Sequence, residues 1–174
     1  DLYESYCGSI LATSALGAAL PSVAGHLTQT DIVSRVNAPL IIAGIGIILS
    51  IIGIFSVRCK EGSSMMTLLK ALRTGTWGSS ILILIACAVL AACDIISWGI
   101  FGAVVSGLIA GVVIGYSTEY YTSDEYKPTR ELSAQAQMGP ATTIIDGLAL
   151  GMLSAGIPVL ATVIAIICSY GFAG

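Results

Sequence analysis

The sequence predicts an all-α membrane protein, a polytopic helical bundle with about five transmembrane helices. Of its 174 residues, 56% are hydrophobic and only 10% are charged, and the mean hydropathy is +0.94. A soluble domain carries about 25% charged residues, so a water-soluble globule is not expected. The charges lie between long uncharged blocks of about twenty residues, the length that crosses about 30 Å of hydrocarbon as an α-helix.

The five helices are expected at residues 2–21, 37–57, 76–94, 97–118 and 141–171 of a single transmembrane fragment. The first has a polar start and an apolar remainder that ends before His26. The other four follow the uncharged blocks at 36–57, 74–93, 95–118 and 147–174. The chain begins without Met, and its first residues contain no basic segment and no signal-peptide cleavage site. We therefore expect an internal piece of a longer protein.

The basic residues predict the orientation of these helices. Six of the seven lysines and arginines lie in the segments 58–75 and 119–140, whereas the other connections hold only Arg35. Loops rich in Lys and Arg face the cytoplasm, so these two segments are expected to be cytoplasmic loops. The helix at 2–21 would then run from the cytoplasm to the exterior. Within the second loop, "TRELSAQAQ" is a candidate for a short interfacial helix.

Small residues and cysteines indicate helix packing rather than a ligand site. GxxxG steps, which allow helix backbones to approach closely, occur at Gly107, Gly111 and Gly115 and at Gly147 and Gly151. Pro158 is expected to kink the last helix. The five cysteines (Cys7, Cys59, Cys87, Cys93 and Cys168) form no CxxC pair. The net charge of −3 and the lack of a basic patch with interleaved aromatics predict no nucleic-acid partner.

Asp1, Glu4 and Ser5 are the candidate site residues, because a spacing of three and four places them on one face of a helix. Carboxylates inside a membrane are costly and mark functional sites. Hard oxygen ligands suit Na⁺ or a proton relay better than a soft metal. A helix cap at the interface, where acids favour the N-terminal dipole, explains Asp1 and Glu4 equally well from periodicity alone.

The remaining ionisable residues point to no catalytic site. Asp146 is expected to snorkel to the cytoplasmic interface, although a functional role is the alternative, and His26 is expected to be a solvated loop residue. No Ser-His-Asp set, phosphate-binding glycine loop or pair of catalytic acids is found in the sequence. These 174 residues are therefore not expected to carry out catalysis by themselves.

The segment "DLYESYCGSILATSALGAAL" resembles the sixth transmembrane helix of membrane-bound, ion-pumping pyrophosphatases. The resemblance continues through "LIIAGIGIILSIIGIFSVR" and "IGYSTEYYTSDEYKPTRELSAQAQMGPATTIIDGLALGMLSAGIPVLA", so the chain corresponds to about the sixth to tenth of the family's sixteen helices. It implies a homodimeric pump in the lipid bilayer of a plasma membrane or an acidic compartment. Such a pump couples hydrolysis of pyrophosphate to transport of Na⁺ or H⁺. Mg²⁺ is the implied cofactor, bound outside this chain, and K⁺ and Na⁺ are candidate activators.

The resemblance also implies roles for the three candidate residues. Asp1 matches a gate aspartate that pairs with basic residues on other core helices, and Glu4 matches a gate glutamate whose position differs between subfamilies. Ser5 matches a gate hydroxyl that joins these carboxylates around Na⁺ in sodium-pumping members. Asp146 stands where a neutral residue is expected, and the family's pyrophosphate-binding residues lie outside this chain.

The transported ion is less well specified than the family. Glu4 has the position found in sodium pumps and in some potassium-independent proton pumps, and "YCGSILAT" resembles sodium-type and dual Na⁺/H⁺ members. Na⁺ is therefore favoured, and a proton-only pump is the alternative. An alternative from another class is a non-enzymatic polytopic membrane protein.

Overall fold

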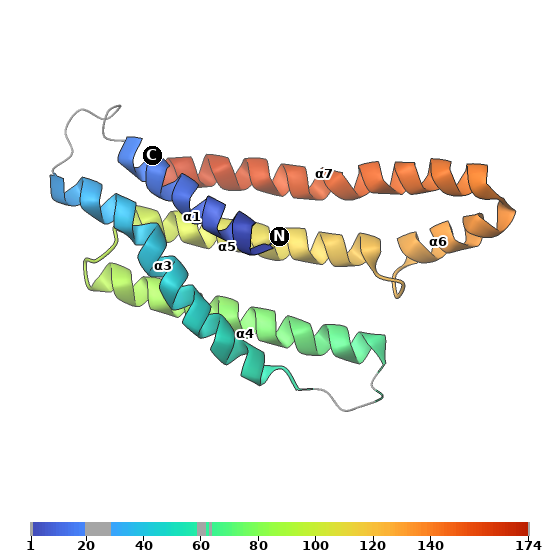
Figure 1. Ribbon diagram of the computed structural model, residues 1–174, viewed down its shortest axis with the longest axis horizontal. Coiled ribbons are helices and arrows are strands. Elements are labelled where there is room, and N and C mark those ends of the chain that lie inside the picture. The colour runs from blue at the N-terminus through green and yellow to red at the C-terminus, as the bar shows by residue number, and fades with distance from the viewer. Residues whose placement is uncertain (1, 20–28, 59–61, 63, 174) are drawn as a thin grey trace. The chain divides into compact units, whose positions relative to one another are not determined.

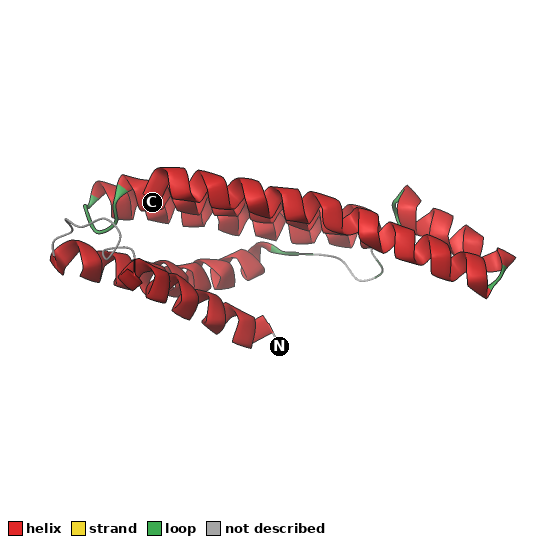
Figure 2. Cartoon of the chain, turned by 90° about the horizontal axis from the view of Figure 1, so that it is seen from above, coloured by secondary structure: helices red, strands yellow, loops and turns green. Residues whose placement is uncertain are grey.

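The computed structural model describes residues 2–19, 29–58, 62 and 64–173, and all the regular secondary structure in these ranges is helical (Figures 1 and 2). This confirms the all-α expectation. The elements are α1 (Leu2–Ala19), α3 (Gln29–Ser56), α4 (Met65–Ala92), α5 (Trp98–Thr122), α6 (Lys127–Gln135), a 3₁₀ turn η1 (Ala136–Met138) and α7 (Pro140–Ala173).

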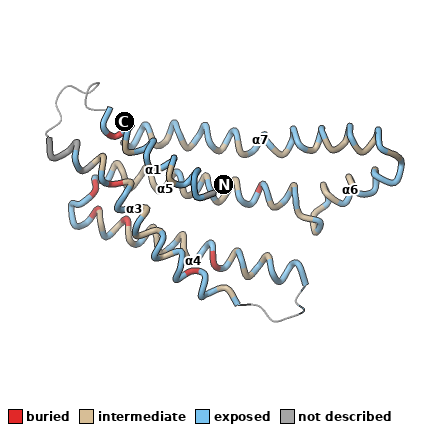
Figure 3. The backbone as a smooth tube through the Cα atoms, viewed as in Figure 1, coloured by how far each residue is buried: buried red, intermediate tan, exposed pale blue. Residues whose placement is uncertain are grey.

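Within the described residues, four stretches are long and apolar enough to cross a membrane, which confirms the polytopic character. They are Arg35–Ser56, Met65–Ala92, Trp98–Met138 and Pro140–Phe172. Few of their residues are buried, and the others are exposed or half-buried (Figure 3), as expected for helices whose surroundings are lipid or other helices rather than water. Helix α1 carries Glu4 and several hydroxyl residues and is not among the four. Its role as a fifth span stays a prediction.

Helix boundaries differ from the predicted ones where charged residues lie within a helix. Helix α4 begins at Met65 rather than 76, so Lys70 and Arg73 lie in its first turns. Helix α3 begins at Gln29 rather than 37, and therefore contains Arg35. Lys and Arg are good helix formers, so a charge ends an apolar block without ending the helix. The predicted interfacial helix is present as α6.

The chain forms two compact units, one extending to Phe101 and the other comprising Gly102–Ala173. In the first unit, α3 packs against both α1 and α4. A Cβ added at Gly17 of α1 would lie 2.9 Å from the carbonyl oxygen of Arg35, and one added at Gly53 of α3 would lie 3.1 Å from Cβ of Ser79. These glycines permit the close helix crossings of this unit.

The predicted GxxxG glycines do not form such crossings within the described chain. A Cβ added at Gly107, Gly111, Gly115 or Gly151 would meet no atom within 4 Å, and one at Gly147 would only reach Cδ1 of Leu132 at 3.9 Å. The spacing alone therefore did not identify the close contacts.

The turn between α4 and α5 is a Schellman motif, which ends a helix with a residue in the left-handed conformation. The Asp94 N–H donates to the Ala91 carbonyl at 3.2 Å, and the Ile95 N–H donates to the Leu90 carbonyl at 3.0 Å. Asp94 has φ 55°, a conformation that favours glycine. Ile96 is 2% exposed, so the turn is anchored by a buried apolar side chain.

In the second unit, α5 and α7 lie side by side (Figures 1 and 2). The hydroxyls of Ser106 and Ser169 form a hydrogen bond of 2.8 Å between the two helices. A Cβ added at Gly102 would lie 2.9 Å from the ring of Phe172, so this glycine makes room for the aromatic side chain. Helix α6 packs back on the start of α7.

Candidate functional site

The candidate site lies at the start of α1, where the structure describes two of its three predicted residues. The side chains of Glu4 and Ser5 are both exposed. Asp1 lies outside the described residues, as does His26. The predicted convergence of three oxygen-bearing side chains is therefore described only in part.

One face of α1 is occupied by α3. The Tyr6 hydroxyl donates a hydrogen bond of 3.2 Å to the carbonyl oxygen of Ala43, and Gly17 is buried against the backbone of Arg35. Cys7, Ile10 and Ser14 are half-buried and share this side of the helix, because residues three and four apart lie on one face. Helix α1 is thus held at both ends by α3.

The predicted site lies on the opposite face, and the described chain leaves that face open. Glu4 and Ser5 are continued along the helix by small exposed residues at positions 8, 12, 15 and 19. A Cβ added at Gly8 would meet nothing within 4 Å. This face can therefore accept a closely packed helix from elsewhere in a longer protein.

Two other hydroxyl residues of α1 are satisfied by their own helix. Ser9 donates to the Ser5 carbonyl at 2.8 Å, and Thr13 donates to the Ser9 carbonyl at 2.8 Å. Such bonds to preceding carbonyls let a hydroxyl lie in an apolar environment without another partner. The Ser9 and Thr13 hydroxyls therefore need no partner from another helix.

The described residues do not by themselves form a metal centre. They contain no group of three or more His, Cys, Asp or Glu side chains that could hold an ion. The four described cysteines are free thiols, and Cys59 lies outside the described residues. Asp146 lies in the second turn of α7 and is half-buried.

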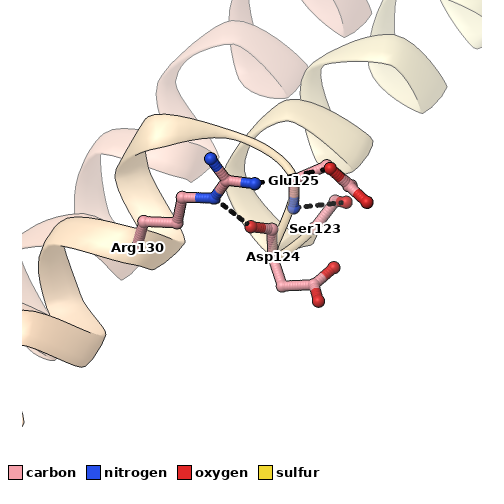
Figure 4. A network of polar contacts seen from close by, with 4 residues as sticks. All are labelled: Ser123, Asp124, Glu125 and Arg130. Carbon is pink, nitrogen blue, oxygen red and sulfur yellow. Dashed lines mark hydrogen bonds and ion pairs between the residues drawn. The ribbon is translucent and has the colours of Figure 1, made fainter. Parts of the chain in front are cut away.

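The polar segment between α5 and α7 is built around Arg130, as Figure 4 shows. Its Nε donates to the Asp124 carbonyl oxygen at 2.8 Å, and its Nη2 lies 3.4 Å from Oε2 of Glu125. The backbone N–H of Glu125 donates to the Ser123 hydroxyl at 3.3 Å. The sequence predicted a loop with a short helix here, and the structure adds a defined turn that Arg130 holds before that helix.

Aromatic and hydroxyl side chains complete this turn. The Tyr120 ring packs edge-on against Tyr121 and tilted against Tyr126, with centroids 5.1 and 5.3 Å apart. Thr129 donates to the Tyr121 carbonyl at 3.1 Å. The tyrosine spacing in "EYYTSDEY" was the available signal, but spacing cannot show that the chain reverses and brings Tyr126 back to Tyr120.

Comparison with known proteins identifies the family. The family model for inorganic H⁺ pyrophosphatase matches residues 1–174. The chain is 53% identical over 98% of its length to a protein of Bacteroides thetaiotaomicron provisionally named a K⁺-stimulated pyrophosphate-energized sodium pump, of which it covers 23%. It is 38% identical to a Clostridium tetani protein with the same provisional name, with 98% of the chain and 24% of that protein covered. A K⁺-insensitive pyrophosphate-energized proton pump of Moorella thermoacetica is 33% identical, with the same coverage.

Proposed function

Because the chain belongs to the inorganic H⁺ pyrophosphatase family, we propose that it is part of a membrane pump that couples pyrophosphate hydrolysis to cation translocation. The observation that carries this proposal is the family match over residues 1–174. The chain spans about a quarter of the length of the curated relatives it matches. The residues that hydrolyse pyrophosphate are proposed to lie in parts of the pump outside this chain, as the family resemblance implies. The family match argues against the alternative of a non-enzymatic membrane protein.

Na⁺ is the favoured transported ion. The relatives at 53% and 38% identity carry sodium-pump names, and a proton pump follows at 33%. Asp1, Glu4 and Ser5 are proposed to form one side of the ion gate, with the remaining ligands supplied by helices outside this chain. The open face of α1 supports this role, because a desolvated cation needs several oxygen ligands and one helix offers few. A proton-only pump remains the second candidate.

The remaining partners follow from the proposed pump. K⁺ is a candidate activator, as the names of two relatives indicate for those proteins. The described residues do not fit a Mg²⁺ site, since they hold no cluster of three acidic ligands. Mg²⁺ is proposed as the cofactor of the pump, bound by parts of it outside this chain. A homodimer, and a plasma membrane or acidic-compartment membrane as its location, belong to the same proposal.

The test uses the full-length pump that contains this chain, reconstituted in sealed vesicles with Mg²⁺ and K⁺. Addition of pyrophosphate should drive uptake of ²²Na⁺. A protonophore should leave that uptake unchanged or increase it, because a primary sodium pump needs no proton gradient. Uptake abolished by the protonophore would contradict a primary sodium pump. Two results together would favour the proton-only pump: proton uptake in sodium-free medium, and no uptake of ²²Na⁺ when it is supplied.

A further inference from the structure

Ser117 of α5 is a buried hydroxyl for which the described chain provides no hydrogen-bond partner. The residue is 4% exposed, and its Oγ meets neither a donor nor an acceptor among the described residues. Other helical hydroxyls here bond back to a carbonyl three or four residues earlier, as Ser106 does to Ala103 and Ser154 to Gly151, both at 2.8 Å. Leaving a buried hydroxyl without a partner is costly, so Ser117 needs one from another source.

The helical register of α5 and α7, set by two contacts about three to four turns away, indicates what lies opposite Ser117. The Ser106–Ser169 hydrogen bond and the Gly102–Phe172 contact set an antiparallel register at this end of the two helices. Eleven residues make about three complete turns of an α-helix. Moving eleven residues from Ser106 leads to Ser117 on the same face of α5, and the matching move from Ser169 leads to Pro158 on the same face of α7.

Pro158 leaves an acceptor without its helical donor at this level. Proline has no backbone N–H, so the carbonyl of the residue four positions earlier, Ser154, lacks its usual helix hydrogen bond. Pro158 lies inside α7, and both it and Ser154 are half-buried. By this register, the unpartnered Ser117 hydroxyl of α5 and the carbonyl of α7 that lacks its usual donor because of Pro158 lie at the same level.

We propose that the Ser117 hydroxyl and the Ser154 carbonyl bind one water molecule between α5 and α7. A direct bond is not made, because Ser117 Oγ has no partner within reach. A buried water usually makes two to four hydrogen bonds, and the Ser154 hydroxyl in the same turn offers a third partner. A water here satisfies both helices without fixing them directly to each other, so α7 keeps freedom to bend at Pro158.

The test is a double-mutant cycle on the thermal unfolding of the full-length pump. Ser117→Ala should lower the midpoint by about 1–3 °C when Pro158 is present. In a Pro158→Ala background, residue 158 regains an N–H and bonds the Ser154 carbonyl. Ser117→Ala should then cause no loss. Ser106→Ala is the matched control, and its effect should be the same in both backgrounds, because its partner lies three turns away. Equal losses from Ser117→Ala in the two backgrounds would overturn the proposal.

A second comparison does not require Pro158→Ala to fold. Ser117→Thr and Ser117→Val have the same shape, and only the first keeps a hydroxyl, so the Thr variant should have the higher midpoint. A structure of the pump at a resolution that shows ordered waters should place one within hydrogen-bonding distance of Ser117 Oγ and the Ser154 carbonyl oxygen. A direct bond between them, or no density there, would contradict the inference.

Discussion

Replacing Gly17 with alanine tests how closely α1 is held to α3. The added Cβ would lie 2.9 Å from the carbonyl oxygen of Arg35 and 3.2 Å from its carbon, whereas ordinary contacts begin at 3.4 Å. These neighbours are backbone atoms, which cannot rotate away as a side chain can. The crossing of the two helices must therefore open by about 0.5 Å.

Two opposing effects set the size of the change. Overpacking a close contact costs about 1–3 kcal/mol, while alanine gains about 1 kcal/mol over glycine in a helix. The net expectation is a loss of up to about 2 kcal/mol. Gly44→Ala and Gly46→Ala in α3 are the controls, because a Cβ added at either meets nothing within 4 Å. They should keep or raise stability.

The assay is the thermal unfolding midpoint of the full-length pump in one detergent, with residual pyrophosphate hydrolysis after heating as a second measure. The unfolding midpoint and the residual hydrolysis of the Gly17→Ala variant should both be lower than those of the wild type, and those of the two control variants should not. A Gly17→Ala protein as stable as both control variants would refute the close packing of α1 on the Arg35 backbone.

Three further predictions concern the gate, the topology and the α4–α5 turn. Glu4→Gln removes a charge but keeps the size of the side chain, so in the full-length pump it should strongly weaken Na⁺ activation and leave pyrophosphate affinity nearly unchanged. Hydrolysis measured against Na⁺ concentration checks this, and unchanged Na⁺ activation would show that Glu4 is not in the ion path. Single cysteines introduced at Ser64 and Asp124, with the native cysteines replaced, should not react with an impermeant thiol reagent in intact cells but should react once the cells are opened. Labelling in intact cells would contradict the predicted cytoplasmic location of these two loops. Asp94→Gly relieves a left-handed non-glycine residue and should raise stability by about 0.5–1 kcal/mol, seen as a higher unfolding midpoint; a lower midpoint would show that the Asp94 side chain stabilises the turn.

The sequence predicts the helical class and the approximate spans because hydropathy over about twenty residues reflects what a membrane requires. It does not predict where helices begin. Lys70 and Arg73 marked the edge of an apolar block, yet α4 continues through both of them. A charged residue indicates where the apolar environment ends. A helix ends where its backbone hydrogen bonds end, and Lys and Arg do not interrupt these bonds.

The candidate site was predictable as a face of α1 but not as a place within the fold. Periodicity grouped Glu4 and Ser5, and the structure places both on the exposed side of the helix. Helix α3 packs against the other face of α1. One contact there is the hydrogen bond from the Tyr6 hydroxyl to the Ala43 carbonyl, which joins residues 37 positions apart in the sequence. No local pattern encodes such a contact, and GxxxG spacing likewise missed the crossings at Gly17 and Gly53.

The length of α7 sets the depth at which Asp146 can lie. Its 34 residues extend about 51 Å at 1.5 Å per residue. Transmembrane helices tilt by at most about 40°, and at that tilt α7 still rises about 39 Å, more than the roughly 30 Å of hydrocarbon. About eight residues must therefore project beyond the acyl chains. Asp146 is the only charged residue of this helix. Projection of the end that carries it costs the least free energy, so we expect the carboxylate to lie among headgroups and water.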